Sequence, residues 1–311
     1  WQGRLYFELK QIDLAVWHRW IPFPDEIDIQ QGKGALRGWL TLAEGAIDNW
    51  LIDTALHQIQ ANLSSNLPKL ELDFLQGRMG SKQFNQSGNH VQEWTTHRLN
   101  FKLAHQQTVT NPINALWRKY QDLESSEESN YLQIDEIDIG AWANLLGYLP
   151  VDAALREQIK KYSPTGRVEQ MQFSWKGNWS EPHSYQLDTR FNDLSLNNIH
   201  WGHLTAVNGL SGSVQRTELE GLLHLDSQSI SLKLLQPFSE PIVFDTLSAK
   251  VDWKIAAHQD SITYQIKDLV FSNAYVSGSS IHGSYRHDQT NSNWIDLRGS
   301  LDQADISYLK R

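Results

Sequence analysis

The feature that most constrains the fold is a run of alternating apolar and polar residues between Asn208 and Leu301. From Leu247 to Ile255, apolar side chains at every second position are separated by Ser, Lys and Asp. This is the two-residue period of a strand with one face in contact with water. The same period recurs at 219–225, 230–234, 262–266 and 295–301.

At least five strands therefore follow one another, joined by loops that carry Ser, Asp, Gln, Pro and Gly. The loops are too short to hold crossover helices, so the strands must pair as an antiparallel meander. One face of the resulting sheet is apolar along its whole length.

The rest of the chain has many strand signals and few helix signals. We expect strands at 5–9, 34–42, 50–56, 70–74, 99–103 and 168–175, and two more between 185 and 203. Helices are expected at 14–21, 141–149 and 153–162, with Asp152 as the N-cap of the last. Residues 77–89 and 121–130 are expected to be loops. The predicted fold class is mainly β: an elongated, curled antiparallel sheet with a few short helices between repeat units.

A short motif predicts those repeat units. Residues 12–17 and 137–142 both read hydrophobic, Asp, hydrophobic, two further positions that are small except at Val16, and then Trp. A third start follows at Asp305. We therefore expect a first unit at 1–133, a second at 134–303 and the start of a third at 304–311. Each unit would add strands to a growing sheet and depend on its neighbour for cover.

Charge and cysteine content exclude several functions. The chain has 27 Lys and Arg against 36 Asp and Glu, a net charge of −9, and no basic stripe, which argues against a nucleic-acid partner. The absence of Cys excludes disulfides and thiolate metal sites and suits an oxidising compartment. The chain opens on Trp1 without a signal sequence and has no apolar run of roughly 18 residues. We interpret it as part of a longer protein, with any membrane anchor outside this chain.

Candidate catalytic and metal sites are weak. His200 and His203 stand three positions apart in a strand-like region, which would direct them to opposite faces. The Gly209–Gly212 segment lacks the spacing of a nucleophile elbow. Glu218 and Glu220 are interpreted as solvated residues of one polar face rather than as a glycosidase acid pair. We predict that the chain is not an enzyme and has no catalytic residue, no metal and no cofactor.

The 13 tryptophans keep a carbohydrate-binding or carbohydrate-active β-protein open as an alternative, because flat aromatic rows bind sugars. Trp175 and Trp253, however, are in phase with the other apolar residues of their strands, which favours an apolar lining.

A long apolar face with so few helices needs a second sheet or a ligand. If the sheet curls and leaves a groove, its natural ligand is an acyl chain, since burial of hydrocarbon yields roughly 0.8 kcal/mol per CH₂. A chain of about 16 carbons would then gain on the order of 12 kcal/mol. The predicted groove-lining residues are Phe173, Trp175, Leu187, Leu219, Leu223, Leu225, Ile230, Leu232, Leu234, Leu247, Val251, Trp253, Ile262, Tyr264 and Ile266.

Several segments resemble one family when they are taken in order. They are GLSGSV at 209–214, TELEGLLHLDS at 217–227, FSEPIVFDTLSAKVDW at 238–253, LVFSNAYVSGS at 269–279 and IDLRGSLDQADISYL at 295–309. From about Asp138 onward the chain resembles the YhdP branch of the AsmA-like proteins, and the first unit resembles it more loosely. That branch is similar to TamB and to the eukaryotic bridge-like lipid transfer proteins.

The resemblance implies a periplasmic protein of a Gram-negative cell with a repeating β-groove, anchored in the inner membrane and reaching the outer membrane. Phospholipids would move along the groove. The family offers no catalytic residues to carry over. The likeness to TamB leaves a third reading open, a scaffold for outer-membrane protein assembly.

Overall fold

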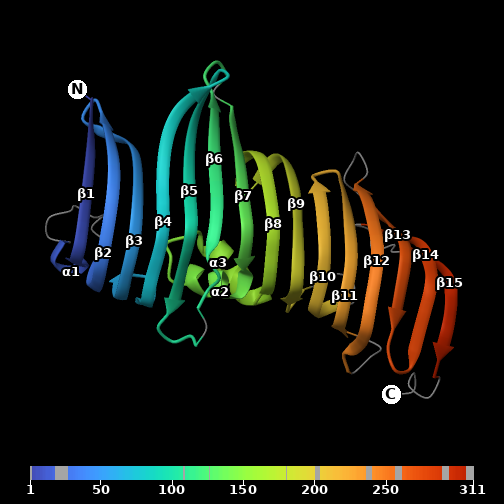
Figure 1. Ribbon diagram of the computed structural model, residues 1–311. Helices are drawn as coiled ribbons and strands as arrows, with labels where there is room; N and C mark the ends of the chain where they lie inside the picture. The colour runs from blue at the N-terminus through green and yellow to red at the C-terminus, as the bar shows by residue number, and fades with distance from the viewer. Residues whose placement is uncertain are drawn as a thin grey trace. The chain divides into compact units, whose positions relative to one another are not determined.

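The computed structural model describes residues 2–17, 27–107, 109–125, 127–179, 181–199, 204–235, 240–255, 261–288 and 294–305. Over these residues the chain forms one sheet of 15 strands in sequential order, in which the assigned neighbours pair antiparallel (Figure 1). Its edge strands are β1 (Gln2–Asp13) and β15 (Trp294–Ala304). The predicted fold class, a curled antiparallel sheet with a few short helices, is confirmed.

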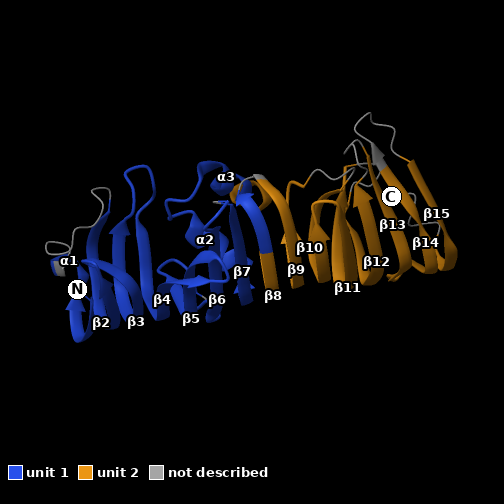
Figure 2. Ribbon diagram, turned by 90° about the horizontal axis from the view of Figure 1, so that it is seen from above, with its two compact units in different colours: residues 1–158, 174–181 blue, residues 159–173, 182–311 orange. Residues whose placement is uncertain are grey.

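The chain divides into two compact units (Figure 2). Unit 1 comprises Trp1–Gln158 and Ser174–Glu181, and unit 2 comprises Ile159–Phe173 and Pro182–Arg311. Compactness does not test internal repetition, so the repeat units at 1–133, 134–303 and 304–311 stay a prediction.

Unit 1 begins with β1 and holds the longest strands. After β1 come β2 (Asp28–Ala43), β3 (Ala46–Asn62), β4 (Leu70–Gln86), β5 (Asn89–Leu103), β6 (Ile113–Asp122) and β7 (Glu128–Asp138). The helices are α1 (Leu14–Trp17), α2 (Ile139–Leu146) and α3 (Ala153–Tyr162). α3 has the predicted bounds, and residues 18–21 of the first predicted helix lie outside the described residues.

The remaining strands continue in the same order into unit 2. They are β8 (Thr165–Asn178), β9 (Glu181–Leu196), β10 (Leu204–Thr217), β11 (Glu220–Leu234), β12 (Ile242–Ile255), β13 (Ser261–Ser272) and β14 (Val276–Asp288), followed by β15. The boundary between the units falls within β8.

In both copies of the repeated motif, the Asp ends a strand and caps the helix that follows. Asp13 ends β1, and its Oδ1 accepts a hydrogen bond from the Ala15 backbone N–H at 3.1 Å. Asp138 ends β7, and its Oδ1 accepts from the Ala141 N–H at 2.9 Å. Each Asp thereby satisfies an N–H that the first helical turn leaves without a partner. Of the third start, only the residues up to Asp305 are described.

Eight of the 15 strands contain an interior residue in the left-handed region of φ. These residues are Gln58, Arg98, Gln170, Asp193, Ser229, Asp268 and Ser280, with φ between 50° and 56°, and Gly209 with φ of 79°. Those in β3, β5, β9, β10, β11, β13 and β14 coincide with β-bulges, where the strand bends and its twist increases. The row of bulges is the local cause of the curl.

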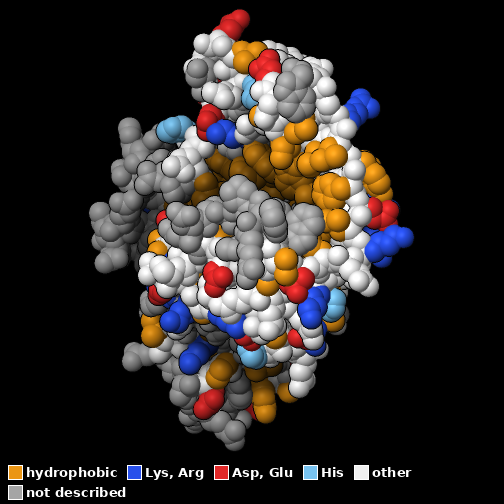
Figure 3. All heavy atoms as spheres, turned by 90° about the vertical axis from the view of Figure 1, so that its left-hand side faces the viewer, with side chains coloured by type: hydrophobic (Ala, Val, Ile, Leu, Met, Phe, Trp, Pro, Cys, Tyr) orange, Lys and Arg blue, Asp and Glu red, His pale blue; other side chains and the backbone are white. Residues whose placement is uncertain are grey.

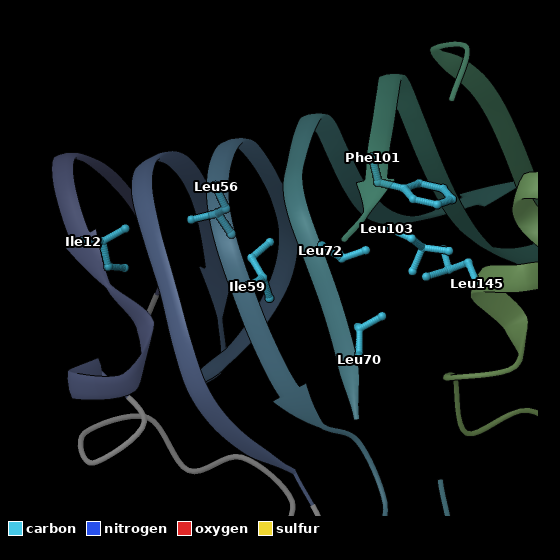
Figure 4. Close-up of a cluster of buried hydrophobic side chains, with 8 residues drawn as sticks. All are labelled: Ile12, Leu56, Ile59, Leu70, Leu72, Phe101, Leu103 and Leu145. Carbon is cyan, nitrogen blue, oxygen red and sulfur yellow. The ribbon is translucent and has the colours of Figure 1, made fainter. Parts of the chain in front are cut away.

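A bulge also changes which side chains share a face. Leu56 and Ile59 flank Gln58 and point to the same side of β3, although they stand three positions apart (Figure 4). A strict two-residue alternation would place them on opposite faces.

Three predictions about strand limits were wrong. The segments predicted at 219–225 and 230–234 form one strand, β11, which begins at Glu220 and has Ser229 at the change of phase. Residues 77–86 are strand rather than loop, because Gly77 allows close pairing: an added Cβ there would lie 2.5 Å from the Leu99 Cα. One strand, β9, covers residues 181–196, where two strands were expected between 185 and 203.

The expected loop at 121–130 is also shorter than predicted. β6 continues to Asp122 and β7 begins at Glu128, so the connection is reduced to residues 123–127, which begin with a turn at 123–125. Asp122 stabilises this turn, since its Oδ1 accepts hydrogen bonds from the backbone N–H groups of Glu124 and Ser125 at 2.9 and 2.7 Å.

The hydrophobic core of unit 1 lies on the face that carries Leu56 and Ile59, here called the inner face. Side chains from four strands and one helix converge there (Figure 4): Ile12, Leu56, Ile59, Leu70, Leu72, Phe101, Leu103 and Leu145. α2 supplies Leu145, and its Trp142 ring meets Phe101 edge-on at 5.2 Å. α2 therefore covers part of the inner face of unit 1.

Candidate functional site

Strand register defines a continuous apolar face in unit 2. Residues directly opposite each other in an antiparallel pair have side chains on the same face. Leu223 of β11 lies opposite Val251 of β12, which lies opposite Ile266 of β13. One row further along the strands, Trp253 lies opposite Tyr264. We call the face that carries these residues the apolar face of unit 2.

The register brings most of the predicted lining residues together on this face. From β9, β11, β12 and β13 they are Leu187, Leu223, Leu225, Ile230, Leu232, Leu234, Leu247, Val251, Trp253, Ile262, Tyr264 and Ile266. Most are half-buried, whereas Ile230 is fully buried. Half-buried side chains pack against their neighbours and still leave part of their apolar surface accessible to a ligand.

The register does not place the other three predicted residues on this face. Leu219 is in the turn between β10 and β11 and is 52% exposed. Phe173 and Trp175 are on β8, next to β9, and the Phe173 ring centroid lies 6.2 Å from that of Tyr185. Trp175 is buried, so it contributes packing more than exposed surface.

Sequence reasoning missed an aromatic row on the apolar face. The rings of Trp253 and Tyr264 lie 6.1 Å apart, and those of Tyr264 and Tyr285 stack at 5.9 Å. Gly221 lies opposite Trp253, and an added Cβ at Gly221 would overlap the indole. Tyr285 could have indicated the row, but it lies in β14, a strand that the sequence did not predict.

The inner face of unit 1 has a comparable pair. The rings of Trp94 and Trp117 stack at 4.5 Å, and the Trp117 Nε1–H donates to Asn130 Oδ1 at 3.2 Å. Seen from the side of β1, hydrophobic side chains gather in a hollow (Figure 3). Hydrophobic side chains therefore line a recess on this side of the molecule.

Comparison with known proteins decides the family. The model of the YhdP protein family matches residues 1–311. The chain belongs to the YhdP family. No curated protein and no solved structure matches it. Within the part of this YhdP family chain that the structure describes, no helix has both the length and the apolar character needed to cross a membrane.

The opposite face of this YhdP family chain is polar and rich in ion pairs. In unit 1, Asp53 receives Arg78 Nε at 2.5 Å and Arg37 Nη2 at 2.6 Å. The hydrogen bond from Arg78, followed by that from Arg37, lowers the pKa of Asp53 to about 2 despite partial desolvation. In unit 2, Lys267 pairs with Asp252 at 2.5 Å. Each unit is thus amphipathic, with ion pairs on one face and mostly apolar side chains on the other.

One carboxylate on the polar side of unit 1 is nearly buried. Glu93 is 5% exposed and lies between Lys82 at 2.9 Å and Arg118 at 2.7 Å. Burial raises its pKa, but the hydrogen bonds from Lys82 and Arg118 outweigh burial and leave the pKa below its ordinary value. Glu93 is therefore a paired structural anion.

The acidic residues weighed as a catalytic pair are engaged in structure. Glu218 lies in the turn after β10, and its Oε2 accepts the Tyr185 backbone N–H at 3.1 Å. Glu220 pairs with Lys254 at 3.6 Å. Among the described residues, no group of three or more His, Cys, Asp or Glu is arranged to hold a metal ion. His200 and His203 lie outside the described residues.

Proposed function

We propose that this chain is a segment of a bridge-like lipid transport protein whose apolar groove carries phospholipid acyl chains between the inner and outer membranes. The observation that carries the proposal is the register of the apolar face, in which row after row of hydrocarbon side chains continues from strand to strand. Membership of the YhdP family supports the same reading.

Energetics favour an acyl chain as the occupant. Each CH₂ removed from water contributes roughly 0.8 kcal/mol. Rows such as Leu223, Val251 and Ile266 are half-buried, so a chain laid along them finds contacts without displacing the core. An exposed apolar surface of this kind marks an interaction site in a soluble protein.

The proposed mechanism is passive. Acyl chains lie against the apolar face, while headgroups stay in solvent at its edge. No step breaks or forms a covalent bond, so the protein acts without catalytic residues and without a cofactor. Phospholipids and the two membranes are the proposed partners, with contact to the membranes made by parts outside this chain, including an inner-membrane anchor, and the periplasm is the proposed location.

Site-specific photo-crosslinking tests the proposal. A photoreactive amino acid replaces Val251 on the apolar face, and the matched control replaces Lys250, its exposed neighbour on the other face of β12. We expect phospholipid adducts by mass spectrometry at position 251 and none at position 250. Equal labelling at the two positions, or no lipid at position 251, would contradict the proposal.

A second candidate, carbohydrate binding, is favoured by one observation. Trp117 stacks on Trp94 and is 39% exposed, which gives a flat aromatic surface of the type that binds sugar rings. A glycan array separates the two functions. Saturable glycan binding that Trp117→Ala removes would support this candidate, and an array without signal would eliminate it.

A further inference from the structure

One charged residue interrupts the apolar face of unit 2. Arg216 of β10 lies opposite Leu187 of β9 and opposite Gly221 of β11, in the row that continues to Trp253. From β9 to β15, Arg216 is the one charged side chain at a described position of this face. A guanidinium on a hydrocarbon surface is costly unless it has a partner or reaches water.

The contacts of Arg216 leave its hydrogen-bond donors available. Its guanidinium carbon lies 5.6 Å from the centroid of the Tyr185 ring, an arrangement typical of a cation–π contact. That contact orients the group but uses none of its N–H donors. Among the described carboxylates, none lies within 4.0 Å of Arg216, and Glu218, two residues along the chain, is occupied by the Tyr185 N–H.

Arg216 stands at the edge of the apolar face. β10 ends at Thr217, so one residue separates Arg216 from the turn. The aromatic row of Trp253, Tyr264 and Tyr285 follows the same edge. Trp and Tyr combine an apolar ring with a polar tip and therefore favour the boundary between hydrocarbon and water.

We propose that Arg216 binds the phosphate of a phospholipid whose acyl chains lie on the apolar face of unit 2. The guanidinium fork matches phosphate oxygens and gives charge-assisted hydrogen bonds. Val214 and Leu223 occupy the next row inward, two residues along each strand and roughly 7 Å away. The apolar row therefore lies beside the position of the phosphate. This arrangement suits a phospholipid, which joins a phosphate to acyl chains, better than free phosphate, which has no hydrocarbon. The inference rests on the proposed lipid transport and names the edge from which headgroups protrude.

The test compares two lipids with identical acyl chains. Purified protein is incubated with vesicles that contain equal amounts of dioleoylphosphatidylethanolamine and dioleoylglycerol, and the retained lipids are quantified by mass spectrometry. We expect wild type to retain the phospholipid in preference to dioleoylglycerol, and Arg216→Gln to reduce that preference about tenfold, the effect of losing one charge-assisted hydrogen bond. Arg216→Lys should keep part of it.

Arg190→Gln is the matched control, because Arg190 is an exposed residue of the adjacent strand β9 on the opposite face. It should leave the preference unchanged. An unchanged preference in Arg216→Gln, or an equal loss in Arg190→Gln, overturns the inference while lipid transport stands. Retention of neither lipid by folded wild type overturns both. Binding of inorganic phosphate alone that depends on Arg216 and excludes lipid overturns the lipid assignment.

Discussion

Leu223 and Leu222 are neighbours on β11 that face opposite sides of the sheet: Leu223 pairs with Val251 on the apolar face, and Leu222 pairs with Asp252 on the polar face. Both side chains are half-buried. They therefore make a matched pair that separates an effect on the groove from a general effect on the strand.

Leu223→Glu should block lipid passage while Leu222→Glu should not. A carboxylate in the groove must be desolvated by each passing acyl chain, which costs several kcal/mol. The measurement is transfer of a fluorescent phospholipid between vesicles by the two purified variants, with circular dichroism to confirm folding. Val251→Asp, in the same row, should behave like Leu223→Glu. Similar transfer by Leu223→Glu and wild type would count against the proposed route.

The sequence predicts the type of sheet but not its internal irregularities. Alternation from Leu247 to Ile255 is sufficient to predict a strand and its two faces, and Asp152 is sufficient to predict the start of α3. The bulge at Ser229 was not predictable. Nothing in the sequence indicates that this Ser adopts a left-handed backbone conformation, and the change in alternation resembles a turn between two strands. For the site, the apolar residues were predictable, but the row that joins Trp253, Tyr264 and Tyr285 depends on register set by such bulges.

Ser229 should be sensitive to β-branching. Its φ of 56° lies in the left-handed region, where a β-branched side chain is strained. We expect Ser229→Val to lower the free energy of unfolding by roughly 1–3 kcal/mol, and Ser229→Gly to be neutral or mildly stabilising. Urea unfolding measures both. Ser231→Val, in the same strand without positive φ, is the control, and an equal loss there would argue that the conformation at Ser229 is not the cause.

Gly221 should not tolerate a larger residue. An added Cβ would overlap the Trp253 indole, so Gly221→Val forces the ring away from β11. Overpacking of this kind costs typically 1–3 kcal/mol. The aromatic row would also lose its order, which near-ultraviolet circular dichroism detects. Gly45→Val is the control, because nothing lies within 4 Å of a Cβ built there; its positive φ of 85° adds backbone strain but no contact with an aromatic ring.

Loss of the Asp138 N-cap should loosen α2. The Asp138 carboxylate satisfies the Ala141 N–H at 2.9 Å, and Asp138→Ala should cost about 1 kcal/mol. Because α2 carries Leu145 into the core of unit 1, hydrogen exchange should increase at α2 and at the strand that carries Phe101. Asp135→Ala, an exposed change on β7, should leave exchange at α2 unaltered.

Stability should fall in acid because of Asp53. Its pKa is lowered to about 2 in the folded protein from an ordinary value of 3.8, so the unfolded state binds the proton more readily. The contribution is therefore complete above about pH 4 and disappears as the pH falls through about 2. Because Arg37 and Arg78 are 47% and 41% exposed, solvent screening limits it to on the order of 1 kcal/mol. Urea unfolding of wild type and Asp53→Asn at pH 2 and pH 5 measures it. The two proteins should differ in free energy of unfolding at pH 5, and this difference should shrink at pH 2. An equal difference at both pH values would show that ionisation of Asp53 does not contribute to stability.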